Sequence, residues 1–220
     1  MSSMYETIME LPLFKGIGDD QLSQLLEKTS VEFLKYDDGD MIARSDQRVD
    51  SVDFILGGRV RQTYSLKNFA ICVDEILGKG SVLGALNLFG LTTTYNADIL
   101  ALGKVNLMRI TKSDYMNILV SDRIYMLNFM NFLSAASQKS KIIFQNQKQA
   151  SIGRTLQTLA LSFASRTAET VMVAGKDSEL AKFCGVSDQE FETWKLNELS
   201  HNRIMSNQRG IFVKSPRLFK

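Results

Sequence analysis

Residues 178–199 hold side chains whose types and spacing fit one kind of chemistry, the reading of base edges by a helix. Two short helical patterns flank the stretch 184–187, as in a helix-turn-helix whose second helix enters a DNA groove. Four carboxylates and one base lie on that second helix: Asp188, Glu190, Glu192, Glu198 and Lys195. Because phosphates wall a DNA groove, an acidic helix at this place needs its own physical explanation.

Helix capping supplies one explanation. Ser187 and Glu190 fit a capping box, S-x-x-E, in which the glutamate reaches back to the serine amide. Acids in a first turn are also favoured by the helix dipole, by ~0.3–1 kcal/mol each. Asp or Glu can still accept from a cytosine amino group, and Gln can pair with adenine. The acids therefore weaken the expectation of DNA binding without removing it.

The residues predicted to contact DNA lie on this helix and among the Lys and Arg residues near it. They are Lys176, Ser178, Ser187, Asp188, Gln189, Thr193, Lys195 and Arg209, with Arg203 and Lys214 adding charge near the C-terminal end. Phe191, Trp194 and Leu199 are predicted to be packing residues, since a single tryptophan there is more often core than a base-stacking platform.

Charge is divided unevenly along the chain. Residues 1–122 carry 12 Lys/Arg against 17 Asp/Glu, whereas residues 123–220 carry 14 against 7. A split between halves suggests that the C-terminal half meets a polyanion, and ordinary solvated surface is the alternative.

The bulk composition is that of a globular protein. Hydrophobic residues make up 45% and charged residues 23% of the 220 residues. No apolar run approaches the ~18 residues that span a bilayer, and the N-terminal segment lacks the pattern of a signal peptide. Cys72 and Cys184 are expected to be reduced, buried and structural. The sequence thus predicts a cytoplasmic protein without a membrane partner.

Secondary-structure patterns divide the chain into three parts. Residues 19–29 predict a short helix, and short strands separated by glycine turns recur over 31–110, which is typical of an antiparallel barrel or jelly roll. Residues 124–136 form a helix apolar on nearly every side, predicted to continue to about Gln149. Such a helix is covered either by its own domain or, as its length favours, by a partner's copy.

The C-terminal part is predicted to be smaller. A helix with an apolar face is expected over 152–163, a strand or turn over 169–175, and a β-hairpin with its turn near Asn207–Gly210. The predicted domains are residues 1–120, the long helix 121–149, and 150–220.

The order of these parts resembles the cyclic-AMP receptor protein / fumarate-nitrate regulator family of bacterial transcription factors. The segments that carry the resemblance are 11–17, 36–42, 54–62, 77–89, 178–187 and 202–214. The resemblance implies an α+β fold: an N-terminal antiparallel β-roll (jelly-roll-like) sensor domain, a long dimerisation helix and a C-terminal winged helix-turn-helix. It also implies a homodimeric transcriptional regulator that binds double-stranded DNA, with RNA polymerase as a candidate partner.

The ligand cassette departs from the family's pattern. After Gly84, Ala85 stands where the family's cyclic-nucleotide binders have a ribose-binding Glu, and Tyr95 stands where they have a phosphate-binding Arg. The predicted pocket residues are Gly84, Ala85, Leu86, Tyr95, Asn96 and Ala97. Because a buried phosphate without its cation is strongly penalised, cyclic AMP binding by the usual mode is not expected. Either the site has collapsed onto Tyr95 and Leu86 or it takes a different, unknown effector.

The DNA-reading helix departs as well. Asp188 and Thr193 stand where the resemblance implies two arginines, and Gln189 stands at a glutamate. The usual arginine-to-guanine contact is therefore lost, so the target is not expected to resemble the family's common operator.

Other functions find little support in the residues. The iron–sulfur cysteines are missing, and His201 is the single histidine, so no metal site, haem or other cofactor is predicted. No nucleophile–base set indicates catalysis, and the chain is not expected to be an enzyme. We therefore expect a DNA-binding homodimeric regulator. The alternative is a degenerate family member that does not bind DNA, whose acidic helix docks a basic protein partner.

Overall fold

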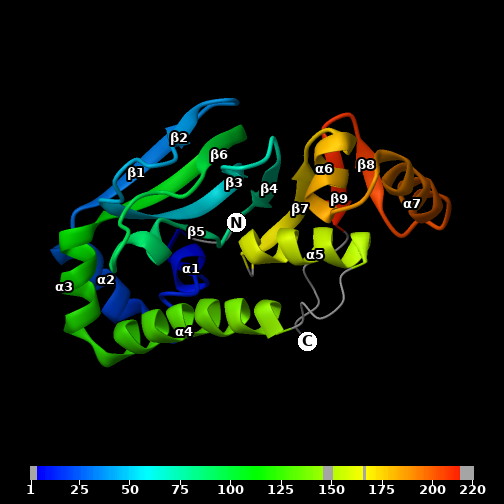
Figure 1. The fold of residues 1–220 in the computed structure, drawn as a ribbon. Coiled ribbons are helices and arrows are strands. Elements are labelled where there is room, and N and C mark those ends of the chain that lie inside the picture. Colours follow the sequence, from blue (N-terminus) through cyan, green and yellow to red (C-terminus); the bar gives the residue numbers. More distant parts are fainter. Residues whose placement is uncertain (1–3, 146–150, 166, 214–220) are drawn as a thin grey trace. The chain divides into compact units, whose positions relative to one another are not determined.

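The computed structural model describes residues 4–145, 151–165 and 167–213 (Figure 1). Its helices are α1 (Met4–Met9), α2 (Asp19–Lys28), η1 (Ala85–Asn87), α3 (Lys112–Ser121), α4 (Arg123–Gln145), α5 (Ile152–Phe163), α6 (Asp177–Cys184) and α7 (Asp188–Ser200). Its strands are β1 (Val31–Tyr36), β2 (Met41–Ala43), β3 (Ser51–Ser65), β4 (Cys72–Leu77), β5 (Val82–Leu83), β6 (Asp98–Thr111), β7 (Ala168–Ala174), β8 (Met205–Asn207) and β9 (Gly210–Val213). The predicted α+β class is confirmed.

The chain forms two compact units. The first contains residues 1–60 and 78–139, and the second contains residues 61–77 and 140–220. This division differs from the predicted boundaries in two respects: residues 61–77 group with the C-terminal part, and the predicted long-helix segment 121–149 is divided between the units at residue 139.

Antiparallel strands form the frame of the first unit. β1 pairs with β6 from Val31↔Ile110 to Tyr36↔Val105, β2 pairs with β6, and β5 pairs with β3. Figure 1 shows β1, β2 and β6 side by side. Since side chains alternate along a strand, Asp53 and Phe54 on β3 point to opposite faces of the sheet.

Aromatic side chains pack α4 onto its own unit. The ring of Phe14 lies 5.2 Å from Phe54 and 6.0 Å from Tyr125, and Phe129 lies 5.7 Å from Tyr115. Asn128 Nδ2 fixes the same face of α4 by donating to the carbonyl oxygen of Lys15 at 2.8 Å. One side of this apolar helix is therefore covered by its own unit.

Other apolar side chains of α4 are exposed in the single chain. They are Met126 (36% exposed), Leu127 (56%), Met130 (54%) and Leu133 (36%). Residues 146–149, over which the helix was predicted to continue, lie outside the described residues.

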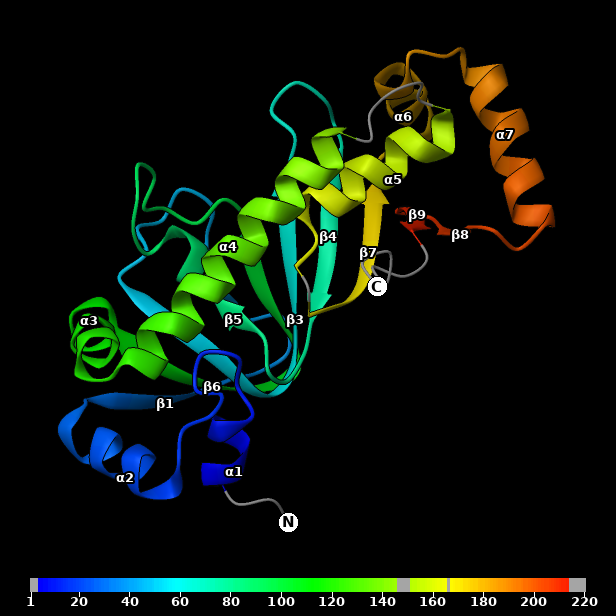
Figure 2. The same cartoon turned by 90° about the horizontal axis from the view of Figure 1, so that it is seen from below.

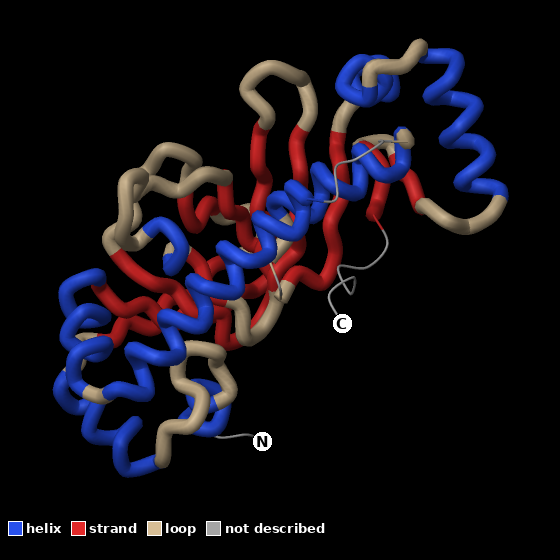
Figure 3. The backbone as a smooth tube through the Cα atoms, turned by 60° about the horizontal axis from the view of Figure 1, so that its bottom comes forward, coloured by secondary structure: helices blue, strands red, loops and turns tan. Residues whose placement is uncertain are grey.

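Four strands of the antiparallel sheet belong to the second unit, in the order β4-β7-β9-β8 (Figure 2). Residues 168–174 form strand β7, which pairs with β4 through Cys72↔Ala174, Asp74↔Met172 and their neighbours. The second unit includes the last part of β3, from residue 61, and all of β4. Figure 3 draws the loop between these strands in tan. The hairpin made by residues 61–77 is thus an integral part of the C-terminal unit.

Two carboxylates are buried in this hairpin. Glu75, 1% exposed, accepts from the Tyr64 hydroxyl at 2.9 Å and from the Ser165 amide at 2.6 Å. Asp74, 3% exposed, accepts from Thr63 Oγ1 at 2.7 Å and from Arg209 Nη2 at 3.1 Å. Burial, and then the charge of Glu75, raise the pKa of Tyr64, which keeps its hydroxyl a donor. These bonds tie the hairpin to the segments around Ser165 and Arg209.

The two cysteines are free thiols and are half-buried rather than buried. Burial raises the pKa of Cys184 to about 11, so this thiol is protonated at neutral pH.

Replacing Glu75 tests the role of the buried hairpin. Glu75→Gln turns one acceptor oxygen into an NH₂ group that faces donors, so the free energy of unfolding should fall by about 1–3 kcal/mol. Urea denaturation followed by circular dichroism measures this change. Glu169→Gln makes the same chemical change at an exposed position of β7 and should stay within about 0.5 kcal/mol of wild type. Equal effects of the two variants would contradict the role given to Glu75.

Candidate functional site

Two helices joined by a three-residue turn lie where residues 178–199 predict them. α6 ends at Cys184, and Gly185 adopts the left-handed conformation at φ 71°, with its amide donating to the carbonyl oxygens of Ala181 and Lys182. A residue with a side chain rarely adopts this conformation, so glycine is needed for the turn. Leu180 and Phe191, one from each helix, are fully buried. The predicted pair of helices is confirmed.

The predicted capping box is present at the start of α7. Ser187 Oγ accepts from the Glu190 amide at 3.3 Å, and Glu190 Oε2 accepts from the Ser187 amide at 2.9 Å and from its hydroxyl at 2.8 Å. These hydrogen bonds, the backbone one first, lower the pKa of the exposed Glu190 carboxyl. Glu190 therefore stabilises the helix start, and its position is explained without a ligand.

The outward face of α7 is polar and acidic. Its exposed side chains beyond the first turn are Glu192, Thr193, Leu196, Asn197 and Ser200, while Asp188, Gln189 and Glu190 are exposed in that turn. Thr193 Oγ1 donates to the Gln189 carbonyl oxygen at 2.8 Å. Phe191 is buried as predicted, and Trp194 and Leu199 are half-buried. No Lys or Arg side chain lies on this exposed face.

Three of the basic residues that were predicted to contact phosphate form ion pairs within the protein. Lys195 Nζ lies 2.9 Å and 2.8 Å from the two carboxylate oxygens of Asp177. Arg203 Nη1 lies 3.2 Å from Glu198 Oε1, and Arg209 pairs with the buried Asp74. The sequence did not reveal two of these partners, because Asp177 and Asp74 are 18 and 135 positions away from the basic residues that they neutralise.

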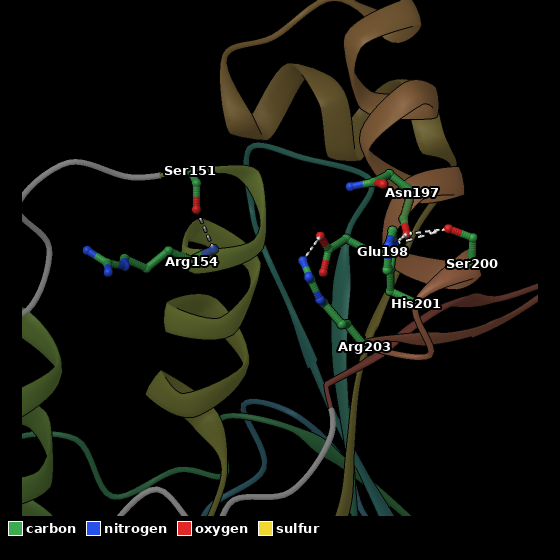
Figure 4. A network of polar contacts seen from close by, with 7 residues as sticks. All are labelled: Ser151, Arg154, Asn197, Glu198, Ser200, His201 and Arg203. Carbon is green, nitrogen blue, oxygen red and sulfur yellow. Dashed lines mark hydrogen bonds and ion pairs between the residues drawn. The ribbon is translucent and has the colours of Figure 1, made fainter.

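Other bases of the second unit are exposed and have no ion pair within the described part of the chain. They are Lys67, Lys182, Arg154 and Lys176, the last of which precedes the first residue of α6. Ser178 is exposed in the first turn of α6, and Lys214 lies outside the described residues. In Figure 4 the Arg154 side chain extends away from Ser151, whose hydroxyl caps α5 by accepting from the Arg154 amide at 3.4 Å. Sequence patterns gave no reason to select Arg154 or Lys182.

The C-terminal end of α7 is closed by local hydrogen bonds (Figure 4). His201 Nδ1 lies 2.8 Å from the Asn197 carbonyl oxygen, which also accepts from Ser200 Oγ at 2.8 Å. A carbonyl oxygen can only accept, so Nδ1 is the donor in this contact.

The predicted hairpin follows α7, with β8 and β9 paired through Asn207↔Gly210. Asn207 Oδ1 holds the turn by accepting from the amides of Arg209 at 2.8 Å and Gly210 at 3.2 Å. A Cβ at Gly210 would lie 2.1 Å from the Val173 carbonyl oxygen, so only glycine lets β9 approach β7 this closely.

The predicted ligand cassette lies in the first unit and contains both buried and exposed residues. Ala85, Tyr95 and Ala97 are buried, whereas Leu86 is 53% exposed and Asn96 is exposed. Leu86 therefore does not fill a collapsed site. Gly84 is left-handed, and a Cβ there would lie 2.8 Å from the Ser51 carbonyl oxygen and 3.2 Å from the Tyr95 hydroxyl.

A buried ion pair accompanies Tyr95, and sequence reasoning missed it. Asp53 is 0% exposed and accepts from Arg109 Nε at 2.8 Å and Nη2 at 2.7 Å. Burial, and then the charge of Asp53, raise the pKa of Tyr95, while Arg109 and a hydrogen bond with Ser51 act in the opposite direction. The one available signal was a single charge within each of two apolar strand segments, residues 52–56 and 105–110.

No group of three or more His, Cys, Asp or Glu side chains that could hold a metal ion occurs among the described residues. In the same part of the chain, no helix is long and apolar enough to cross a membrane.

Residues 33–122 match the sequence profile of the cyclic nucleotide-binding domain. The crystal structure of the Catabolite Activator Protein of Thermus thermophilus is similar over 92% of this chain and 93% of its own, with a TM-score of 0.53 and 15% identity. The c-di-GMP responsive global regulator CLP of Xanthomonas campestris matches over 90% and 100%, with a TM-score of 0.52 and 14% identity. The sensor domain of the transcriptional regulator DNR from Pseudomonas aeruginosa matches over 67% and 99%, with a TM-score of 0.51 and 18% identity. None of the curated proteins matches the sequence.

These findings define the class of protein. The chain has the fold seen in the Catabolite Activator Protein and CLP, and residues 33–122 match the cyclic nucleotide-binding domain. The resemblance that the sequence indicated is confirmed at this level.

Removing the capping carboxylate should change stability in a pH-dependent way. The pKa of Glu190 is lower in the folded state than its ordinary value of 4.5, so its contribution is fully present above that value. As the pH falls through the folded pKa, the contribution is lost. The difference in unfolding midpoint between wild type and Glu190→Ala should therefore be constant from pH 7 to about pH 5.5 and shrink below about pH 4.5.

Thermal unfolding at several pH values, followed by circular dichroism, makes this measurement. Glu192→Ala removes an exposed carboxylate from the same helix outside the capping box and serves as the matched control. A Glu190→Ala difference that persists unchanged at pH 3 would contradict the assignment.

Proposed function

We propose that the protein is a homodimeric transcription regulator that binds DNA through its second unit. The observation that carries the proposal is the sequence of elements from α6 to β9: two helices around a left-handed glycine, then a hairpin, with the second helix exposed. This is the order of a winged helix-turn-helix, which reads the major groove with its second helix. The similarity in fold to the regulators named above supports the same function.

Base reading, in this proposal, uses neutral polar and acidic side chains. Gln189 and Asn197 can pair with adenine, Thr193 can contact a thymine methyl group, and Glu192 can accept from a cytosine amino group. No exposed Lys or Arg side chain on α7 is available for a bidentate contact with guanine. The operator should therefore differ from one selected by arginine contacts.

Phosphate attraction has to come from outside α7. Lys176, Lys182 and Arg154 are exposed and free of ion pairs among the described residues, whereas Lys195 is neutralised by Asp177. Few free bases next to several carboxylates imply weak nonspecific affinity, so specific contacts must carry more of the binding energy than usual.

Dimerisation is assigned to the open face of α4. Met126, Met130 and Leu133 recur at helical spacing and are exposed, as is Leu127, whereas Tyr125 and Phe129 are buried. These four apolar side chains left in water favour a partner, and a second copy of the same helix supplies a matching surface. In this proposal, a signal received by the first unit shifts a population between two arrangements of the dimer.

DNA binding is tested by fluorescence anisotropy with labelled genomic fragments at several salt concentrations. Wild type should bind with an affinity that falls as salt rises. Lys176→Ala removes one phosphate contact, so it should weaken binding across all sequences and reduce the salt slope by about 1.

Lys104→Ala deletes the same charge from an exposed position of the first unit and should bind like wild type. Undetectable binding at low salt, with the protein folded, would reject this function in favour of the alternative in which α7 docks a basic protein.

The dimer is tested by replacing one exposed apolar residue of α4. Met130→Lys places a charge at the centre of the proposed interface, so sedimentation velocity should show a shift from dimer to monomer. Met41→Lys changes an exposed methionine on β2 and should leave the sedimentation coefficient unaltered. A wild-type protein that is monomeric at tens of micromolar would rule the interface out.

A further inference from the structure

The ion pair between Asp53 and Arg109 is the most enclosed charge in the first unit. The Asp53 side chain is 0% exposed, and its two oxygens receive Nε and Nη2 of Arg109 at 2.8 Å and 2.7 Å. Ser51 Oγ donates to the first of these oxygens at 3.2 Å. A carboxylate with a bidentate guanidinium and a hydroxyl donor has the surroundings that a bound oxyanion would need.

This pair lies beside the ligand cassette. The Ser51 carbonyl oxygen and the Tyr95 hydroxyl both lie within 3.2 Å of the position that a Cβ of Gly84 would occupy. The charge of Asp53 raises the pKa of Tyr95, and the charge of Arg109 lowers it. The cationic side chain beside the cassette is therefore Arg109 of β6, whereas the family's arginine position is held by Tyr95.

The pair is complete without any ligand. A free anion could bind the Nε–Nη2 edge of Arg109 only by displacing the Asp53 carboxylate, which would then be buried without its partner. Arg109 itself is reachable, because its side chain is 28% exposed. A small anion is therefore kept from the Nε–Nη2 edge of Arg109 because the Asp53 carboxylate already binds it.

We propose that the Asp53 carboxylate is a built-in anion that occupies the oxyanion site of the β-roll, so that the first unit is held together without an anionic effector. Removal of this carboxylate would leave a vacant site of defined chemistry, with Arg109 and Ser51 as donors, that accepts a small oxyanion from solution. The proposal concerns the first unit alone and does not depend on DNA binding.

Anion rescue of a cavity variant tests the proposal. Wild type, Asp53→Ala and Asp53→Ala/Arg109→Met are unfolded thermally with increasing sodium formate or inorganic phosphate, and with sodium chloride at matched ionic strength. Wild type should show no saturable rise in its midpoint. Asp53→Ala should have a lower midpoint that formate raises saturably, since a ligand of the folded state stabilises it. The double variant should lose this rise because the anion has no guanidinium to bind.

Asp50→Ala is the matched control, because Asp50 forms an exposed pair with Arg48 at 2.9 Å and leaves no enclosed site. If Asp53→Ala does not fold alone but folds in formate, the proposal is supported. If it folds in neither condition, Asp53→Ser, which retains a polar side chain, decides by the same titration.

Two outcomes would overturn the proposal. One is a folded Asp53 variant that no anion stabilises beyond the effect of chloride. The other is a wild-type protein that binds phosphate or cyclic AMP with an affinity that Arg109→Met abolishes, since Asp53 would then not occupy the site.

Discussion

A carboxylate removed from water must be given donors, and this constraint governs both units of the molecule. Asp53, Asp74 and Glu75 are the three buried acids of the described chain, and each accepts at least two hydrogen bonds. Each of them has one donor from a distant position of the chain: Arg109, Arg209 and Ser165, respectively. A strand slipped by one residue would turn these carboxylates to the other face and break the bonds, so they help to fix the strand register.

A separate, local cause explains why α7 can be acidic. At the first turn, Glu190 finds its donors in Ser187, and Asp177 at the start of α6 neutralises Lys195. Local stability thus accounts for much of the charge on these helices. What is left for DNA is an outward face of polar and acidic side chains, with positive charge supplied by neighbours such as Lys176. Specificity and affinity would then come from different elements of one unit.

Helix α4 shows how one apolar sequence can serve two surfaces. Tyr125 and Phe129 pack against rings of the first unit, whereas Met126 and Met130 remain exposed on the other side. The apolar composition of residues 124–136 predicts that both sides are covered, and the fold covers only one of them. The uncovered side is the physical reason for expecting a second chain.

Local signals in the sequence were sufficient to predict helices, strands, turns and the capping box. Hydrophobic periodicity, glycine placement and the S-x-x-E spacing all act within a few residues. They placed Gly185, Ser187 and the hairpin at Asn207–Gly210, whereas the assignment of the cassette around Gly84 and Tyr95 rests on the family resemblance. Only the tertiary structure decided which charges are free. Arg109 meets Asp53 across 56 positions and Arg209 meets Asp74 across 135, and residues 61–77 join the C-terminal unit through strand pairing with β7. Contacts of this kind depend on how strands far apart in the sequence are aligned, and no local pattern records that alignment.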